Sequence, residues 1–291
     1  MAALTIAANA KINLYLDVTG KRPDGYHDLV TVMQSISLAD TLTFVRVAGE
    51  GIKLDTGGVL PADDSNLICR AARAYFAKTG KPFGLAVKLD KKIPMQAGMG
   101  GGSADAAATL RALNAMDGNR LTAAELCEIG AGLGADVPFC VVGGTRLCKG
   151  IGEVMEPVPN RLNGTLVVAI GGEGVSTPRA FAALDDLHGD FRETAGDANP
   201  AALLDAMENG DLHAAAPHFR NRFEEVIEPI RPAVGQIKEI LRAQGAVAAM
   251  MSGTGPSVWG LFDTSAQAEQ AKVALIQAGA RAFVCGMVQE I

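Results

Sequence analysis

Residues 94–105 of the chain read PMQAGMGGGSAD and place four glycines within five positions. The alternating apolar stretch FGLAVKLD precedes this segment, and the alanine-rich run ADAAATLRALN follows it. This order predicts a strand, a glycine loop and a helix, with Ser103 as the helix N-cap. Glycines let a backbone approach a ligand closely and adopt positive φ, and a helix N-terminus attracts anions. The pattern therefore favours a phosphate-binding loop; a flexible turn against a closely packed helix is the alternative.

The loop matches neither of two common nucleotide-binding motifs. A Walker A loop ends in Gly-Lys-Ser/Thr, and no such tripeptide follows these glycines. The dinucleotide pattern G-x-G-x-x-G fits Gly98 and Gly100, but Ser103 stands where the third glycine belongs. The residues thus exclude a P-loop or a Rossmann interpretation.

Composition narrows the class of protein. A length of 291 residues predicts about two domains. With a net charge of −6 the chain lacks the basic character of nucleic-acid-binding proteins, so no nucleic-acid partner is expected. The five scattered cysteines predict free thiols in a reducing compartment and no metal site. No apolar run approaches the roughly 18 residues of a membrane span, and no basic residue precedes the short apolar start. We therefore expect a cytoplasmic protein with no membrane or signal segment.

Apolar periodicity predicts the main elements of the first half. The first sixty residues read as strands, because stretches such as KINLYLDV alternate between apolar and polar residues. A helix is expected from near Ser65 to Gly80, and another begins at the capping box of Thr122 and Glu125. A further strand is expected around Pro138–Val142.

The second half predicts a different layout. A change of composition near EPVPNRLNG predicts a boundary between domains of residues 1–155 and 156–291. Beyond it we expect a strand, two or three helices over residues 199–244, two strands joined by SGTGP, a helix and a last strand. This order matches a ferredoxin-like split βαβ layout.

Four segments, in order along the chain, resemble one family of enzymes. IPMQAGMGGGSADAAATL resembles the phosphate-binding loop of the GHMP kinase superfamily, and MMSGTGPSVWGLF resembles its C-terminal glycine motif. ANAKINLYLDVTGKRPDGYHDLVTVMQSISLADTL and GADVPFCVVGGTRLCKGIGE resemble the first and the catalytic segments of a member that phosphorylates cytidine-diphosphate-linked methylerythritol in the non-mevalonate isoprenoid pathway. The resemblance implies an α+β, two-domain GHMP kinase fold, with an S5 domain 2-like N-terminal domain that binds ATP and a ferredoxin-like C-terminal domain. The active site would lie between them.

The resemblance also implies the roles of the catalytic residues. Asp136 would accept the proton of the acceptor hydroxyl as general base, and Lys11 would hold that carboxylate ionised. Alone, an aspartate near a proline is usually a turn residue, and a lysine on a strand edge is usually solvated. The resemblance further implies that a glycine loop holds the ATP phosphates, with the candidate residues Pro94, Met95, Gln96, Ala97, Gly98, Met99, Gly100, Gly101, Gly102, Ser103 and Ala104.

Acceptor binding is implied in the same way. In the family a tyrosine and a phenylalanine sandwich the cytosine ring of the small-molecule acceptor, and a histidine forms a hydrogen bond with the edge of that ring. A tyrosine packed on the surface and a phenylalanine in the core are the plainer interpretations. The candidate residues for acceptor binding are Asn13, Tyr26, His27, Thr177 and Phe181. The segment SGTGP would lie near the substrate phosphates.

The loop departs from the family pattern in three places. Gln96 and Ala97 stand where glycines are frequent, and Ala104 stands where a serine is frequent. The contact of the loop with the nucleotide is expected to persist, and Mg²⁺ is expected to arrive with ATP.

Two alternative functions are disfavoured. The segment KRPDGYHDL argues against a sister kinase for homoserine or mevalonate, and the presence of both Lys11 and Asp136 argues against a non-catalytic nucleotide-binding protein. A monomer or weak homodimer is expected.

Overall fold

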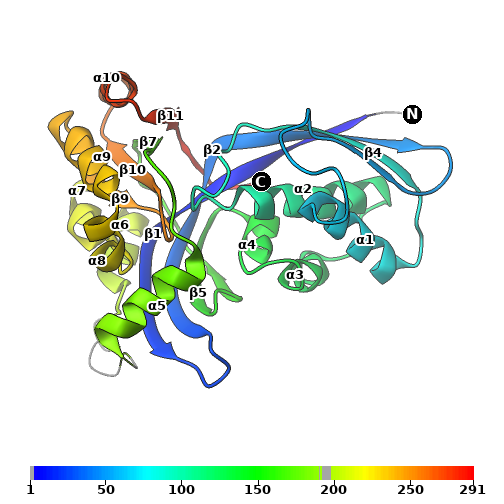
Figure 1. Ribbon diagram of the computed structural model, residues 1–291, viewed down its shortest axis with the longest axis horizontal. Coiled ribbons are helices and arrows are strands. Elements are labelled where there is room, and N and C mark those ends of the chain that lie inside the picture. Colours follow the sequence, from blue (N-terminus) through cyan, green and yellow to red (C-terminus); the bar gives the residue numbers. More distant parts are fainter. Residues whose placement is uncertain (1–2, 190, 192–197) are drawn as a thin grey trace.

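The computed structural model describes residues 3–189, 191 and 198–291, which form two sheets with helices packed against them (Figure 1). The larger sheet has the order β3-β4-β2-β1-β8, and β5 and β12 also pair with β2, while β6 pairs with β5. Its strands are β1 (Leu4–Lys21), β2 (His27–Val47), β3 (Ile52–Asp55), β4 (Gly84–Asp90), β5 (Thr145–Gly150), β6 (Val154–Pro157), β8 (Arg220–Asn221) and β12 (Met287–Val288).

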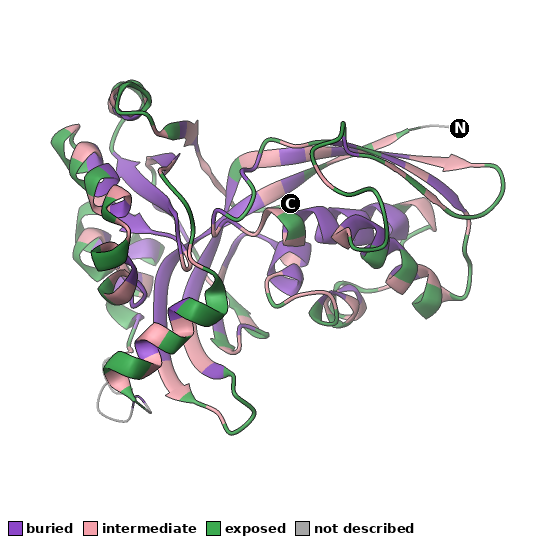
Figure 2. Ribbon diagram, in the orientation of Figure 1, coloured by how far each residue is buried: buried purple, intermediate pink, exposed green. Residues whose placement is uncertain are grey.

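The long antiparallel pair β1 and β2 is the central feature of the larger sheet. Their register runs from Leu4 opposite Phe44 to Lys21 opposite His27, with an irregularity between Asn13 and Tyr15. Residues 10–18 of β1 are all buried (Figure 2), so the strand is covered on both faces rather than on one. A cluster of four helices packs beside this sheet: α1 (Leu67–Thr79), α2 (Gly101–Met116), α3 (Ala123–Ala131) and α4 (Val137–Val142).

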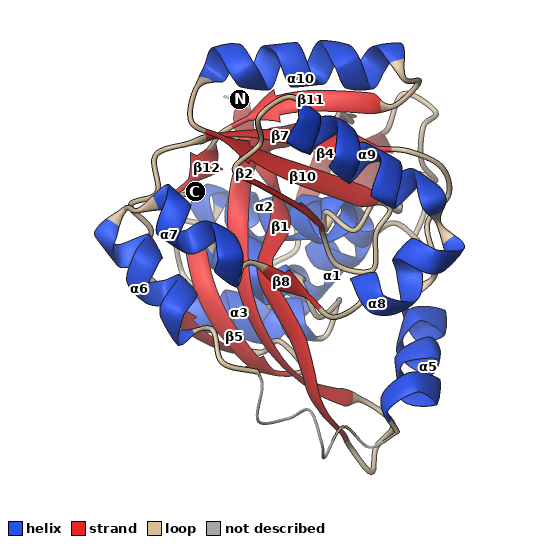
Figure 3. Cartoon of the chain, turned by 90° about the vertical axis from the view of Figure 1, so that its left-hand side faces the viewer, coloured by secondary structure: helices blue, strands red, loops and turns tan. Residues whose placement is uncertain are grey.

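The smaller sheet is antiparallel and has the order β11-β7-β10-β9. Numbered along the chain, these four strands lie in the order four, one, three, two, which is the ferredoxin-like arrangement expected from the sequence. Helices α9 and α10 pack against it (Figure 3). The elements are β7 (Thr165–Ile170), α9 (Pro232–Ala243), β9 (Ala248–Met251), β10 (Ser257–Phe262), α10 (Ser265–Gln277) and β11 (Arg281–Cys285).

Between β7 and α9 the chain forms α5 (Thr177–His188), α6 (Ala201–Asn209), α7 (Leu212–Ala215) and α8 (Glu224–Ile227). Helices α6, α7, α8 and α9 fall within residues 199–244, where two or three helices were expected, because the segment breaks at Gly210 and around the short β8. The expected last strand is divided into β11 and β12. The predicted boundary between residues 155 and 156 stays a prediction, and β8 and β12 from beyond it join the larger sheet.

Two local expectations near the glycine loop are wrong. Gly100, not Ser103, is the N-cap of α2 and has a φ of 67°. The helix therefore begins three residues earlier than expected. The segment Pro138–Val142 belongs to α4 rather than to a strand, because the proline occupies the first helical turn, where its missing N–H is tolerated. The capping box of Thr122 and Glu125 is confirmed. In the described part of the chain, no helix is both long and apolar enough to cross a bilayer.

Candidate active site

Two cavities meet at the glycine loop. The first, of about 740 Å³, extends from Lys11 and Asp136 to the β1–β2 hairpin and α5. The second, of about 610 Å³, is lined by Leu60, Leu67, Lys91 and the loop residues 94–103. Both cavities include the loop residues Gly98, Gly100 and Ser103. The loop thus separates two binding spaces and is reached from both.

Two glycines of the loop have positive φ and pack closely against neighbouring segments. Gly98 and Gly100 have φ of 74° and 67°. A Cβ on Gly98 would lie 2.6 Å from the Ser252 carbonyl oxygen, and one on Gly100 would lie 3.2 Å from Lys11 Cγ. No side chain caps the helix that follows, so the N–H groups of its first turn are open to a ligand. This arrangement fits a polyphosphate.

Lys11 and Asp136 line the first cavity beside Gly100, which lines both cavities. Lys11 Nζ is 3.4 Å from Asp136 Oδ2, and the lysine side chain is almost wholly buried, whereas the aspartate is 37% exposed. Asp136 precedes α4 without capping it, so its carboxylate faces the cavity. A carboxylate exposed to the cavity and paired with an ammonium is a suitable arrangement for accepting a proton from a bound hydroxyl.

Asn13 ties this pair to the C-terminal glycine segment. Its Oδ1 accepts a hydrogen bond from Lys11 Nζ at 3.0 Å, and its Nδ2 donates to Thr31 Oγ1 at 2.9 Å. The backbone N–H of Asn13 donates to Ser252 Oγ at 3.2 Å. Gly253 and Thr254 of SGTGP line the larger cavity. The structure therefore brings Lys11, Asn13 and SGTGP together, as the sequence suggested.

A stacked and ion-paired cluster forms the far end of the larger cavity. The rings of His27 and Phe181 stack with centroids 4.5 Å apart. Asp185 Oδ1 lies 2.7 Å from His27 Nε2, and Lys21 Nζ donates to Asp185 Oδ2 at 2.6 Å. Burial raises the pKa of Asp185, but hydrogen bonds from Lys21 and His27 outweigh that effect and lower it below its ordinary value. The carboxylate therefore draws the Nε2 proton of His27 toward itself.

The remaining acceptor candidates are placed around this cluster. Tyr26, in the β1–β2 hairpin, is 60% exposed and lines the cavity. Thr177 begins α5, and its hydroxyl is 3.5 Å from that of Thr254. Phe181 follows one turn later and also lines the cavity, as expected for two residues on one helical face. All five acceptor candidates thus line one cavity, while Ala104 of the loop is buried in α2 and lines neither.

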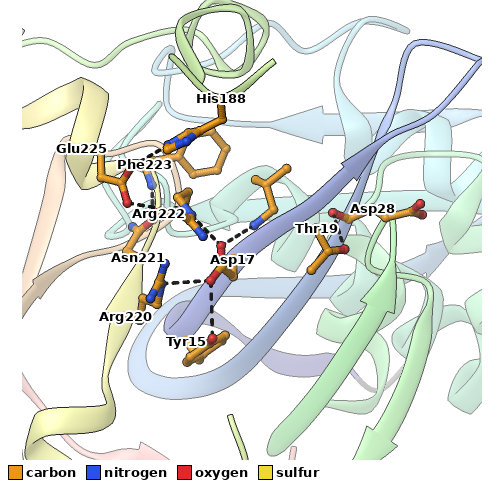
Figure 4. Close-up of polar contacts among 11 residues, drawn as sticks. Tyr15, Asp17, Thr19, Asp28, His188, Arg220, Asn221, Arg222, Phe223 and Glu225 are labelled. Carbon is orange, nitrogen blue, oxygen red and sulfur yellow. Dashed lines mark hydrogen bonds and ion pairs between the residues drawn. The ribbon is translucent and has the colours of Figure 1, made fainter. Parts of the chain in front are cut away.

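An ion network beside the cavity fixes α5 and β8 to β1 (Figure 4). The fully buried Asp17 accepts from Arg220 Nε at 2.9 Å and from Arg222 Nε at 2.7 Å. Glu225 lies 3.3 Å from Arg222 and 2.6 Å from His188 at the end of α5. The network therefore holds α5, which carries part of the acceptor pocket, against the strand that carries Lys11.

Sequence reasoning missed Lys21, Asp185 and Lys91. A signal existed for Asp185, since it follows Phe181 by four residues and shares its helical face. Lys21 lies in the TGKRPDGYH segment that carries Tyr26, but no spacing rule links it to a helix so far along the chain. Leu16 lines the cavity with Lys11 and Asn13, although strict alternation would place it on the opposite face. The register irregularity after Asn13 accounts for this change of face.

Comparisons with known proteins agree with this geometry. The models of the GHMP kinase N-terminal and C-terminal domains match residues 66–144 and 203–281. The chain is 40% identical to the 4-diphosphocytidyl-2-C-methyl-D-erythritol kinase of Exiguobacterium sibiricum over 92% of either protein. It is 44% identical to the kinase of that name from Moorella thermoacetica, over 90% of either protein.

Solved structures show the same fold. A crystal structure of 4-(cytidine 5'-diphospho)-2C-methyl-D-erythritol kinase has a TM-score of 0.82 at 33% identity, covering 98% of this chain and 99% of that one. Homoserine kinase from Cytophaga hutchinsonii has a TM-score of 0.80 at 19% identity, covering 100% and 96%, which shows a shared fold alone. The family matches together cover more than half of the chain, and the curated relatives align along nine-tenths of it. As its resemblance implied, the chain belongs to the GHMP kinase family, among the 4-diphosphocytidyl-2-C-methyl-D-erythritol kinases.

Proposed function

We propose that this chain transfers the γ-phosphoryl group of ATP to the 2-hydroxyl of 4-diphosphocytidyl-2-C-methyl-D-erythritol, a step of the non-mevalonate isoprenoid precursor pathway. The observation that carries the proposal is the 3.4 Å pair of Lys11 and Asp136 in one cavity, beside Gly100, which also lines the second cavity. One cavity is lined by the phosphate-binding loop, and the other ends in aromatic and polar side chains suited to a nucleobase. Phosphoryl transfer requires the nucleotide cavity and the acceptor cavity to be open to each other at one proton-accepting side chain.

The glycine loop would hold the nucleotide. The residues Pro94 to Ser103 line the second cavity, and the first N–H groups of α2 point to where the phosphates would lie. ATP supplies the phosphoryl group, and we propose that Mg²⁺ arrives bound to it and keeps several water ligands. Among the described residues there is no cluster of three or more His, Cys, Asp or Glu side chains suited to a metal ion.

Asp136 would take the proton of the acceptor hydroxyl, and Lys11 would offset negative charge as the phosphoryl group moves. Asn13 accepts a hydrogen bond from Lys11 and so fixes the direction of its ammonium. Because phosphoryl transfer depends mainly on positioning and charge stabilisation, these contacts account for the role of the β1 strand.

Selection of the acceptor would take place at the far end of the larger cavity. Tyr26 would provide a ring face for cytosine, and Phe181 would provide the face that does not stack on His27. Asp185 would hold the proton on Nε2 of His27, which leaves Nδ1 as an acceptor for the base edge. Such contacts reject acceptors without the base, because buried polar groups would be left unpaired.

The proposal is tested by incubating the protein with Mg²⁺-ATP and each acceptor in turn and measuring the release of ADP. Turnover with the cytidylyl acceptor alone is expected. Turnover with homoserine or mevalonate would identify a sister kinase, and nucleotide binding without turnover would identify a non-catalytic protein. We further propose a monomer or weak homodimer, because residues of one chain line both cavities. We propose a cytoplasmic location because the five cysteines are free thiols, as is usual in a reducing compartment.

A further inference from the structure

A buried ion triad lies directly beneath the phosphate-binding loop. Lys91 Nζ donates to Asp105 Oδ2 at 2.8 Å and also to Asp40 Oδ2. Lys91 directly follows β4, Asp105 lies in α2 and Asp40 lies in β2. Each of the three side chains is at most 6% exposed. A Cβ on Gly101 would lie 3.1 Å from Lys91 Nζ, so the lysine ammonium touches the first turn of α2. The triad is therefore in contact with the part of the loop that faces the nucleotide.

The two carboxyl groups of the triad are not equivalent. Asp40 Oδ1 accepts the backbone N–H groups of Lys92 and Ile93 at 2.6 and 2.8 Å. Asp105 Oδ1 is buried with no hydrogen-bond partner. An ionised oxygen in that position is costly, whereas a protonated carboxyl could donate to the neighbouring Asp40. Asp105 is therefore the member of the triad that takes up a proton most readily.

The environment of Asp105 supports this assignment. Its pKa is raised to about 7, chiefly by burial and further by Asp40, with Lys91 acting in the opposite direction. From α4 the thiol of Cys140 is also near, and burial keeps its pKa above the ordinary value. On α1, burial raises the pKa of the Cys69 thiol, and the charges that act on it are those of Asp64, Arg73 and Asp63.

The charge of the triad depends on that proton. With both carboxylates ionised its net charge is −1, and with Asp105 protonated it is zero. A polyphosphate on the first turn of α2 would repel the charged form, and it would also occupy the helix N-terminus that otherwise favours an ionised Asp105. Binding of the nucleotide and protonation of Asp105 should therefore favour each other.

We propose that Asp105 is a positioning residue for nucleotide binding, which takes up a proton from solvent when the phosphates of ATP bind above Lys91. This rests on the proposed function, since it requires a nucleotide on the glycine loop. The bound proton removes a negative charge beneath the loop and leaves Lys91 paired with Asp40 alone. Nucleotide affinity then falls as pH rises through the range in which Asp105 loses its proton.

The test is calorimetric titration of the protein with Mg²⁺-ADP at pH 7.5 in two buffers of different ionisation enthalpy. The difference in heat gives the number of protons taken up, and a non-hydrolysable ATP analogue serves as a second ligand. Asp105→Asn is the matched variant, because it keeps the shape of the side chain and cannot ionise. We expect the wild type to take up more protons than Asp105→Asn and to lose affinity more steeply between pH 7 and 9, by up to about tenfold for a pKa rise of one unit on binding.

Infrared difference spectra of the wild type, with and without nucleotide, give a second measurement that does not depend on the variant folding. Growth of a protonated carboxyl band on binding supports the proposal. Binding with equal proton numbers in wild type and Asp105→Asn, or with no change in that band, would overturn it while leaving the proposed function intact. Absence of nucleotide binding would overturn both.

Discussion

Lys11 of β1 and Asp136 at the start of α4 form an ion pair of 3.4 Å, and Gly100 lies against both. A general base contributes typically about 10²–10⁴-fold to a rate. We therefore expect Asp136→Asn to lower kcat by about that factor, with the ATP dissociation constant near the wild-type value. Steady-state ADP release and calorimetry measure the two quantities. Asp263→Asn, at an exposed residue that follows β10, serves as control, and full turnover by Asp136→Asn would remove this carboxylate from the mechanism.

Substituting Gly100 should weaken nucleotide binding beyond its effect on folding. Gly100→Ala places a methyl group against Lys11 and adopts positive φ, which costs an L-residue roughly 1–2 kcal/mol. Gly118→Ala is the matched control, because Gly118 also has positive φ, of 82°, but a Cβ there meets nothing within 4 Å. Similar losses of unfolding free energy are expected for both variants. A loss of ATP affinity is expected for Gly100→Ala alone, and equal affinities would contradict the position of the phosphates.

Asp185→Asn should weaken acceptor binding without affecting ATP. The change removes the ion pair with Lys21 and the carboxylate that orients His27. We expect a higher KM for the cytidylyl acceptor, an unchanged KM for ATP and a kcat close to wild type. Asp186→Asn, at the exposed neighbouring position, is the control.

The pKa of Asp185 gives this variant a pH signature. Because the pKa is lowered on folding, the stabilisation by its charge is present above the unfolded value, near 3.8, and is lost as pH falls through the folded value. The difference in unfolding free energy between wild type and Asp185→Asn should therefore shrink as pH falls below about 4. A difference that persists in acid would show that the carboxylate charge is not its cause.

Local patterns predicted much of this fold, and the errors have physical causes. Strands β1 and β2, the helix ending at Gly80 and the four strands of the smaller sheet follow from periodicity and turn residues. Val137–Val142 was expected as a strand because a short apolar run fits a buried strand or a buried helix equally well. The Lys11–Asp136 contact came from resemblance to a family, because no local rule brings β1 to the start of α4. The triad of Lys91 with its two aspartates has no sequence signal, since its members lie on three separate elements.

Gln96 carries backbone strain that a glycine would relieve. Its φ of 53° lies in the left-handed region, at a loop position where family members often have glycine. Relief of roughly 1–2 kcal/mol of strain exceeds the roughly 0.5–1 kcal/mol entropic cost of glycine, so Gln96→Gly should raise the unfolding free energy by up to about 1 kcal/mol. Denaturant unfolding measures the change. Gln96→Ala keeps the strain and should give no gain, and an equal gain in both variants would point to the loss of the glutamine side chain.

The stability of the fold should depend strongly on the carboxylate of Asp17. It is fully buried between Arg220 and Arg222, and removal of one partner from a buried pair costs about 3–5 kcal/mol. Asp17→Asn leaves Arg222, itself 4% exposed, with only the more exposed Glu225 as an ionised partner, so we expect a loss of unfolding free energy toward the lower end of that range.

Asp28 offers the matched control for this prediction. It lies on the paired strand, and its side chain is 47% exposed and 3.4 Å from Arg22. Exposed pairs contribute at most about 1 kcal/mol, so Asp28→Asn should change stability little. The Asp17 network also holds α5 against β1. In any residual activity of Asp17→Asn, the KM for the acceptor should therefore rise more above its wild-type value than the KM for ATP does. Equal destabilisation by the two variants would mean that the buried network contributes no more than a surface pair.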